Sequence, residues 1–100
     1  MPHEIHIVQA ALVELRALPR FRRKAVRDGI DRELVHQPTT VTRNRKPLPG
    51  LAPTFEHVPP VWELRLEDYR VFYDVDETEH IVWIRAIGLK SPKERTEDIL

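Results

Sequence analysis

The clearest pattern in the chain is an alternation of hydrophobic and polar residues between positions 61 and 87. It is interrupted by Glu67-Asp68 and again by the acidic segment 76–79. A period of two residues, with enrichment in Val, Ile, Tyr, Trp and Phe, is typical of half-buried strands. The pattern therefore predicts three consecutive strands, residues 61–66, 69–75 and 80–87, joined by two hairpins.

Tight hairpins fix which residues face each other across the strands. Counting outward from the first turn places Arg65 opposite Arg70, and counting from the second turn places Arg70 opposite Arg85. One face of this sheet is almost wholly apolar and must pack against other elements. Its members are Trp62, Leu64, Leu66, Tyr69, Val71, Tyr73, Val82, Ile84 and Ala86.

The opposite face carries Arg65, Arg70 and Arg85 side by side, which we call the arginine row. Like charges directly opposite each other destabilise a sheet. The row therefore indicates a bound anion, most simply a phosphate held by guanidinium groups. Phe72 and Trp83 face each other beside the row and suit a stacked nucleobase. Alternatively, Glu63 and Asp74 neutralise the arginines, and the loop before the sheet covers the aromatic rings.

The N-terminal third of the chain predicts one strand and two helices. Residues 3–8 alternate like a strand, whereas residues 9–17 and 20–36 follow helical spacing and are separated by Pro19. So short a connection predicts an antiparallel helical hairpin on the apolar sheet face, and hence an α+β fold. The buried stripe expected for the second helix is Phe21, Ala25, Ile30 and Leu34, with Val26 at its flank.

Two segments between the helices and the sheet lack a helical period. Residues 39–48 are extended by composition and carry three cations, Arg43, Arg45 and Lys46. Residues 49–60 form a proline-rich loop that contains His57, which is either a proton-transfer group or a solvated loop residue.

The end of the chain carries a signal for the start of a helix. Ser91-Pro92 followed by Glu94 is a capping box, and it predicts a short helix over residues 92–99. The chain holds no internal repeat and no low-complexity tract, so residues 1–100 are expected to form a single domain.

Composition excludes several classes of protein. The 100 residues include no Cys, which excludes disulfides and is compatible with a reducing cytoplasm. No apolar run reaches membrane-spanning length, no signal peptide opens the chain, and no ligand spacing indicates a metal or cofactor. The net charge is +0, yet residues 16–46 hold ten Lys and Arg against three Asp and Glu. The chain can therefore still present a local basic surface.

The order of one strand, two helices and a three-stranded meander resembles the RelE/ParE superfamily of bacterial toxins. The resemblance spans nearly the whole chain and is strongest from residue 46 to residue 90. The segments that carry it are WELRLEDYRVFYDVDE and IRAIGLK, which fit a W-x-L-R block, a Y-R-V-x-Y strand and a final G-x-K/R. The resemblance implies a RelE-like fold and the toxin of a type II toxin–antitoxin pair, whose antitoxin wraps the toxin with a helix and an extended segment.

The resemblance also implies roles for single residues. Arg70 matches the arginine that RelE-type nucleases use on the scissile phosphate, Arg65 matches one of their strand lysines, and Lys90 matches a cation after the last strand. The other strand lysine is replaced by Glu63, which resembles the carboxylate base of YoeB-like toxins or is an ion-pair partner of its neighbour. The tail tyrosine of the RelE pattern has no counterpart, since Thr96 falls near its place. The other residues expected to bind RNA are Arg85, Phe72, Trp83, Arg43, Arg45 and Lys46.

The resemblance leaves more than one activity open. A RelE-like toxin cuts messenger RNA in the ribosomal A site without metal or cofactor, a ParE-like toxin poisons DNA gyrase, and a degenerate member only binds its antitoxin. We expect the first activity, in the cytoplasm and without membrane association, with mRNA on the ribosome and a cognate antitoxin as partners. The expected catalytic residues are Arg70, Arg65, Glu63 and Lys90. An acidic antitoxin segment is expected to cover the arginine row and residues 43–46.

Overall fold

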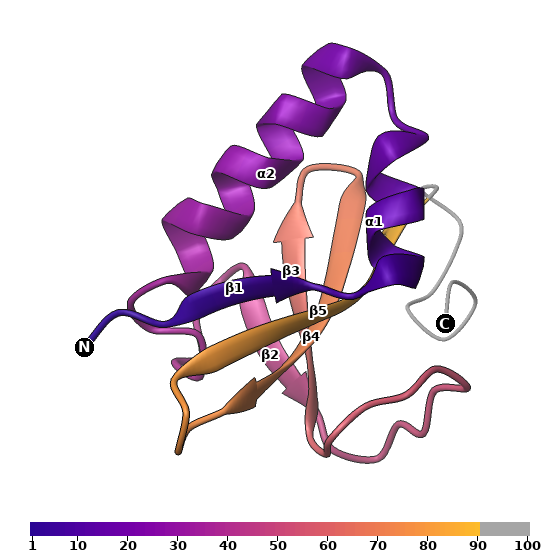
Figure 1. The fold of residues 1–100 in the computed structure, drawn as a ribbon. Helices are drawn as coiled ribbons and strands as arrows, with labels where there is room; N and C mark the ends of the chain where they lie inside the picture. Colours follow the sequence, from indigo (N-terminus) through magenta and orange to yellow (C-terminus); the bar gives the residue numbers. More distant parts are fainter. Residues whose placement is uncertain (91–100) are drawn as a thin grey trace.

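The computed structural model describes residues 1–90 and shows a five-stranded sheet with two helices on one face (Figure 1). The elements in chain order are β1 (Glu4–Ile7), α1 (Gln9–Arg16), α2 (Arg20–Leu34), β2 (Arg45–Leu48), β3 (Val61–Leu66), β4 (Tyr69–Asp76) and β5 (Ile81–Leu89). The strands lie in the order β1-β5-β4-β3-β2. The predicted α+β fold is confirmed, and the helix predicted for residues 92–99 lies outside the described residues.

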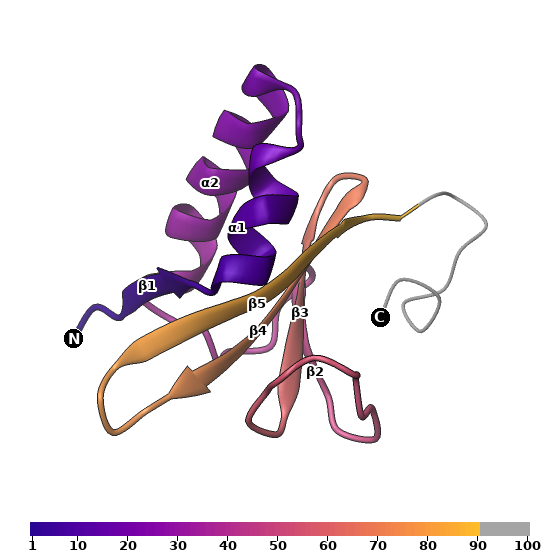
Figure 2. The same cartoon turned by 45° about the vertical axis from the view of Figure 1, so that its right-hand side comes forward.

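The first strand and the two helices have the arrangement that the sequence predicted. β1 pairs with β5 in parallel, with Ile7 opposite Ile84, so the sheet is mixed rather than purely antiparallel. Pro19 has φ −53 and opens α2, as expected for a residue whose ring fixes this angle. Figure 2 shows both helices on the same side of the sheet, where the predicted hairpin places them. Neither helix has the length and hydrophobicity that crossing a bilayer requires within the described residues.

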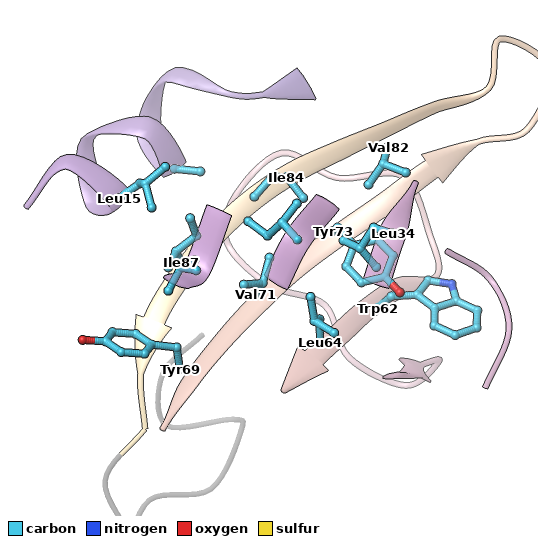
Figure 3. Packing of buried hydrophobic residues seen from close by; sticks show 13 residues of the cluster. Leu15, Leu34, Trp62, Leu64, Tyr69, Val71, Tyr73, Val82, Ile84 and Ile87 are labelled. Carbon is cyan, nitrogen blue, oxygen red and sulfur yellow. The ribbon is translucent and has the colours of Figure 1, made fainter. Parts of the chain in front are cut away.

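The core lies between the helices and the sheet (Figure 3). Leu15 of α1 and Leu34 of α2 contact the apolar sheet face that the alternation predicted. The buried sheet residues of the core are Trp62, Leu64, Tyr69, Val71, Tyr73, Val82, Ile84 and Ile87. Full burial of one large apolar side chain contributes about 1.5–3 kcal/mol to stability, so this layer is the main source of cohesion.

The buried stripe of α2 differs from the predicted one. Phe21 is 71% exposed and Ala25 is exposed, whereas Val26 is buried. The buried face of α2 is thus turned about the helix axis from the predicted one. Gly29 explains this change, because it is buried where α2 crosses the end of β3. A Cβ at this position would lie 2.7 Å from Cδ2 of Leu66. The missing side chain lets this side of α2 approach the sheet, and Phe21 is left in solvent.

The predicted register of the β3–β4 hairpin is confirmed. The Cα partners run from Leu66↔Tyr69 to Trp62↔Tyr73, as a two-residue turn requires. Glu67 adopts φ 55, a left-handed conformation that such tight turns commonly need. Arg65 and Arg70 are therefore direct partners across the two strands.

The predicted register of the β4–β5 hairpin is wrong, and the turn is the first cause. Asp76 pairs with Ile81, so the turn contains residues 77–80 and closes one residue later than expected. Oδ1 of Asp76 accepts hydrogen bonds from the backbone N–H groups of Thr78 and Glu79, both at 3.0 Å. An aspartate that bonds to the backbone in this way favours a turn over continued pairing.

A β-bulge in β5 is the second cause. Tyr73 faces Ile84 whereas Phe72 faces Ala86, which leaves Arg85 as the extra residue between them. After the bulge, the residue that points into the core is Ile87 rather than Ala86.

The arginine row expected from the sequence is therefore not formed. Arg70 faces Gly88 instead of Arg85, and Phe72 faces Ala86 instead of Trp83. Only the pair of Arg65 and Arg70 remains from the expected row.

Tyr73 is fully buried on the helix side of β4, where its hydroxyl donates a hydrogen bond of 2.6 Å to the carbonyl oxygen of Pro38. Burial raises the pKa of this hydroxyl, with Arg45 opposing the rise and Glu33 adding to it. The folded state thus holds the phenol proton more tightly than the unfolded chain. The resulting stability is fully present below the unfolded pKa of about 10 and is lost as the pH rises above it.

Tyr73→Phe should flatten this alkaline loss of stability. The wild-type chain should lose up to about 1.4 kcal/mol of unfolding free energy per pH unit above pH 10, whereas the variant has no group to ionise at this position. At neutral pH the variant should be less stable by about 1–3 kcal/mol, since Pro38 loses its buried donor. Urea unfolding between pH 7 and pH 11 measures both effects. Tyr69→Phe is the control and should keep the wild-type slope; equal slopes for wild type and Tyr73→Phe would contradict the assignment.

Candidate functional site

Three cationic residues, one each from β3 and β4 and one directly after β5, lie near the β3–β4 turn. Arg65 of β3 has a side chain that is 47% exposed, and it lies opposite the partly exposed Arg70 of β4. The backbone N–H of Lys90, directly after β5, donates a hydrogen bond of 2.7 Å to the carbonyl oxygen of Asp68 in the turn. We call Arg65, Arg70 and Lys90 the cationic end. The structure thus brings Arg65, Arg70 and the backbone of Lys90, three of the predicted catalytic residues, to the same turn.

The guanidinium group of Arg70 is held at the turn by the backbone. Its Nη1 donates to the carbonyl oxygens of Glu67 at 2.7 Å and Tyr69 at 2.9 Å. Its Nε is buried and has no hydrogen-bond partner. A buried donor without a partner costs free energy, and an anion at the cationic end would supply the missing acceptor.

Glu63, the fourth predicted catalytic residue, is buried close to two cations. Its side chain is 0% exposed, and its Oε1 lies 3.8 Å from Nε of Arg65 and 4.0 Å from Nζ of Lys46. This arrangement matches the ion-pair interpretation of Glu63. Proton abstraction by Glu63 would additionally require the substrate to reach a fully buried carboxylate.

Arg85 is neutralised by an ion pair and does not join the cationic end. Its Nε donates to Oδ2 of Asp74 at 2.9 Å and its Nη2 donates to Oδ1 at 3.2 Å. The two side chains are 10% and 2% exposed. Oδ2 also accepts the backbone N–H of Val58 at 2.9 Å, which ties the 49–60 loop to the sheet. Bidentate pairs of this kind are strong and geometrically specific.

The two aromatic residues expected beside the arginines occupy different environments. Trp83 is partly exposed and lies between the ring of His6, 4.9 Å away, and Cζ of Arg85, 5.4 Å away. Phe72 is 0% exposed, so it offers no ring surface to a nucleobase in this structure. The alternative interpretation of Phe72 as a covered side chain matches its position.

The three cations predicted in the extended segment 39–48 do not form one patch. Arg45 is buried and donates from Nη1 to the carbonyl oxygen of Glu33, so it fastens β2 to the end of α2. Arg43 and Lys46 are exposed. Of these three residues, only Arg43 and Lys46 are therefore open to a ligand.

Neither His57 nor Tyr73 is placed as a general acid beside the cationic end. Nδ1 of His57 contacts the carbonyl oxygen of Phe55 at 2.9 Å within the 49–60 loop. Tyr73 lies in the core, bonded to Pro38. In the described part of the chain, the cationic end thus supplies charge and hydrogen-bond donors but no assigned proton donor.

A cavity of about 520 Å³ between α2 and the β3–β4 turn adjoins the cationic end. Arg22 and Arg32 of α2 line it together with Arg65. The Cζ atom of Arg22 lies 5.9 Å from the centre of the Tyr69 ring, another residue of the lining. The sequence interpretation missed both helix arginines. The available signal was their spacing of three or four residues from the buried positions Val26 and Gly29.

The geometry can be compared with known proteins. The family whose sequence model matches is described as the ParE toxin of the type II toxin–antitoxin system parDE, and the match covers residues 5–91. A search of curated proteins gave no match.

Solved structures share the fold. The chain is similar to one in the RelBE2 toxin–antitoxin complex from Mycobacterium tuberculosis, with 22% identity over 90% of this chain and 100% of that chain and a TM-score of 0.68. A chain of the archaeal RelE–RelB complex from Pyrococcus horikoshii is 19% identical over 92% of this chain and 99% of that chain, with a TM-score of 0.64. The isolated E. coli RelE toxin is 17% identical over 96% of this chain and 93% of that chain, with a TM-score of 0.65.

At such identities the structural likeness shows the fold alone, whereas the sequence match extends over most of the chain. The resemblance inferred from the meander motif is thereby confirmed, and the chain belongs to the ParE toxin family of type II toxin–antitoxin systems, within the RelE/ParE superfamily.

Proposed function

We propose that this toxin cleaves messenger RNA on the ribosome and that the cationic end binds the scissile phosphate. The observation that carries the proposal is the direct pairing of Arg65 with Arg70. Two cations opposite each other on a sheet repel, and an anion between them removes the penalty. The unpartnered Nε of Arg70 supports the same ligand, because a phosphate oxygen is a suitable acceptor for it.

The reaction needs positioning and charge stabilisation more than a cofactor. The 2′-hydroxyl oxygen attacks the adjacent phosphorus, its proton passes to a base, and the bond to the 5′-oxygen breaks as that oxygen gains a proton. The products are a 2′,3′-cyclic phosphate and a 5′-hydroxyl. Arg65 and Arg70 stabilise the additional negative charge of the transition state, with Lys90 in support. Glu63, whose Oε1 lies 3.8 Å from Nε of Arg65, is the candidate carboxylate for the proton, and its role is tested next.

Glu63→Gln separates a catalytic base from an ion-pair partner. As a base, Glu63 should be indispensable, and the variant should lose about a hundredfold in cleavage rate. As a partner of Lys46 and Arg65 only, its replacement should leave cleavage within a few fold. Primer extension on ribosome-bound mRNA gives the rate, and Glu67→Gln in the exposed turn is the matched control. Given the burial of Glu63, we expect the second result; a hundredfold loss with a normal thermal melt would contradict it.

Gyrase poisoning is the second candidate function. The observation in its favour is that Glu63 is fully buried and that no proton donor is assigned at the cationic end in the described residues. A toxin that acts by binding gyrase needs no such groups. Accumulation of cleaved DNA with purified gyrase, together with intact mRNA in the primer-extension assay, would select this function over the first.

A cognate antitoxin is the partner that a type II system implies. We propose that an acidic segment of it covers the cationic end and the adjoining cavity, where Arg22 and Arg32 add to the charge of Arg65. This replaces the expected cover of a three-arginine row, since Arg85 is already paired with Asp74.

A further inference from the structure

A second cluster of polar side chains lies at the opposite end of the sheet from the β3–β4 turn. It consists of His3, just before β1, and of Glu77 and His80 in the β4–β5 turn. Figures 1 and 2 both show the N-terminus and this turn at the same end of the molecule. One ligand atom from each residue lies within 4.8 Å of the other two. The cluster is therefore separate from the proposed RNA site.

The backbone holds these residues together. The N–H of His3 donates to the carbonyl oxygen of Val35 at 2.7 Å, and the N–H of Glu4 donates to the carbonyl oxygen of His80 at 2.8 Å. The two imidazole rings meet edge to face, with centroids 5.2 Å apart. Both rings are thus positioned by hydrogen bonds that do not depend on their own nitrogen atoms.

Three of the four imidazole nitrogen atoms of the cluster are buried and make no hydrogen bond. The side chain of His3 is only 7% exposed, and neither its Nδ1 nor its Nε2 makes a hydrogen bond. Nδ1 of His80 is also buried without a partner. Buried polar groups in proteins are nearly always satisfied, because an unmet group costs free energy. Each neutral imidazole has one lone pair to give, so the two rings together indicate a ligand that accepts one lone pair from each of them.

We propose that His3, Glu77 and His80 bind a divalent transition-metal ion, with Zn²⁺ as the best match. Two imidazoles and one carboxylate form a known ligand set for zinc, which takes a water molecule as fourth ligand. Bond lengths of about 2.0–2.2 Å in a tetrahedral site place ligand atoms roughly 3.3 Å apart. Nε2 of His3 already lies 3.5 Å from Oε2 of Glu77. All three ligand atoms lie within 4.8 Å of one another, so a metal ion would have to draw them closer by roughly 1 Å.

The contacts around Glu77 also suit this role. Its Oε1 accepts a hydrogen bond from Oγ1 of Thr39 at 3.4 Å, which leaves Oε2 directed toward His3. Outer-shell hydrogen bonds of this kind orient ligating carboxylates. A metal bound here would join the residue before β1 to the β4–β5 turn. We therefore expect it to stabilise the fold without being required for the reaction at the other end of the sheet.

The test uses the full-length chain made by cell-free synthesis without a histidine tag. Titration with Co²⁺ should give the visible absorption of a tetrahedral site, and Zn²⁺ should abolish it by competition. At a Zn²⁺ concentration about a hundredfold above its Kd, the melting temperature should exceed that in EDTA by roughly 10 °C or more. Both responses should vanish in Glu77→Gln and His80→Gln. His6→Gln, which removes an exposed imidazole from the same N-terminal segment, should retain them.

The proposal fails if the wild-type chain shows neither the cobalt absorption nor a melting shift with zinc. It also fails if Glu77→Gln and His80→Gln bind Co²⁺ like the wild type, because another set of ligands would then be responsible. A third contrary result is that both variants melt below the wild type by the same amount in zinc and in EDTA. That result would assign His3 and Glu77 to an ordinary ion pair. If a variant does not fold, the wild-type titration and the other variant still decide the question.

Discussion

Arg70→Ala should abolish growth arrest and lower the rate of mRNA cleavage by about a hundredfold or more, the usual effect of removing one preorganised charge stabiliser. Arg70 is the cation whose position is fixed most firmly, because Nη1 is bonded to two turn carbonyls and Nε retains an unmet donor. It lies directly opposite Arg65, so its loss also removes the second half of the proposed phosphate site. Induction of the variant in growing cells and primer extension on ribosome-bound mRNA measure the two effects.

The control for this experiment is Arg27→Ala, which removes the same charge from an exposed position on α2 outside the cavity. It should retain full toxicity. Arg70→Ala also removes two hydrogen bonds, one exposed and one partly buried, so a loss of about 1 kcal/mol in stability is expected and a thermal melt must accompany the assay. Arg70→Lys keeps the charge without the guanidinium fork and should recover only part of the activity. An Arg70→Ala protein that melts normally and still arrests growth would remove the cationic end from the mechanism.

Asp74→Asn should lower the free energy of unfolding by about 3–5 kcal/mol, the typical cost of breaking a buried ion pair by removing one partner. Asp74 is 2% exposed and receives three hydrogen bonds, two from Arg85 and one from the backbone of Val58. Its neutralisation leaves the arginine charge nearly buried and weakens the attachment of the 49–60 loop. Chemical denaturation of the variant and the wild type gives the difference directly.

Lys24→Ala provides the comparison with an exposed pair. Nζ of Lys24 lies 2.9 Å from Oδ2 of Asp28, the same distance as in the buried pair, but the two side chains are 79% and 59% exposed. Its removal should cost about 0.5 kcal/mol or less. If Asp74→Asn were equally mild, the pair with Arg85 would contribute no more to stability than a surface contact.

The fold was predictable where a short-range rule determined it. The two-residue turn at Glu67-Asp68 leaves a single register for β3 and β4, so alternation alone placed Arg65 opposite Arg70. The β4–β5 turn was not predictable by counting, since Asp76 closes it through side-chain bonds to the backbone and Arg85 is then extruded as a bulge. Neither event changes the hydrophobic pattern by more than the exchange of Ala86 for Ile87 in the core.

The candidate site was predictable only in part, because charge in a sequence does not say what neutralises it. Arg65, Arg70 and the backbone of Lys90 lie at the β3–β4 turn, whereas Arg85 is paired with Asp74 and Arg45 is bonded to a helix carbonyl. These partners lie 11 and 12 residues away along the chain. The cluster of His3, Glu77 and His80 joins opposite ends of the sequence, and no local spacing could reveal it.

The two outer strands of the sheet, β1 and β2, contain only four residues each. An unpaired edge is a template for a further strand and hence for aggregation, and natural proteins weaken such edges with short strands, lysine and proline. β2 carries Lys46 and Pro47, and Pro47 has no N–H to donate. An added strand would find at most about 13 Å of edge on either side. The short edge strands therefore disfavour edge-to-edge pairing between the sheets of two toxin molecules before an antitoxin binds.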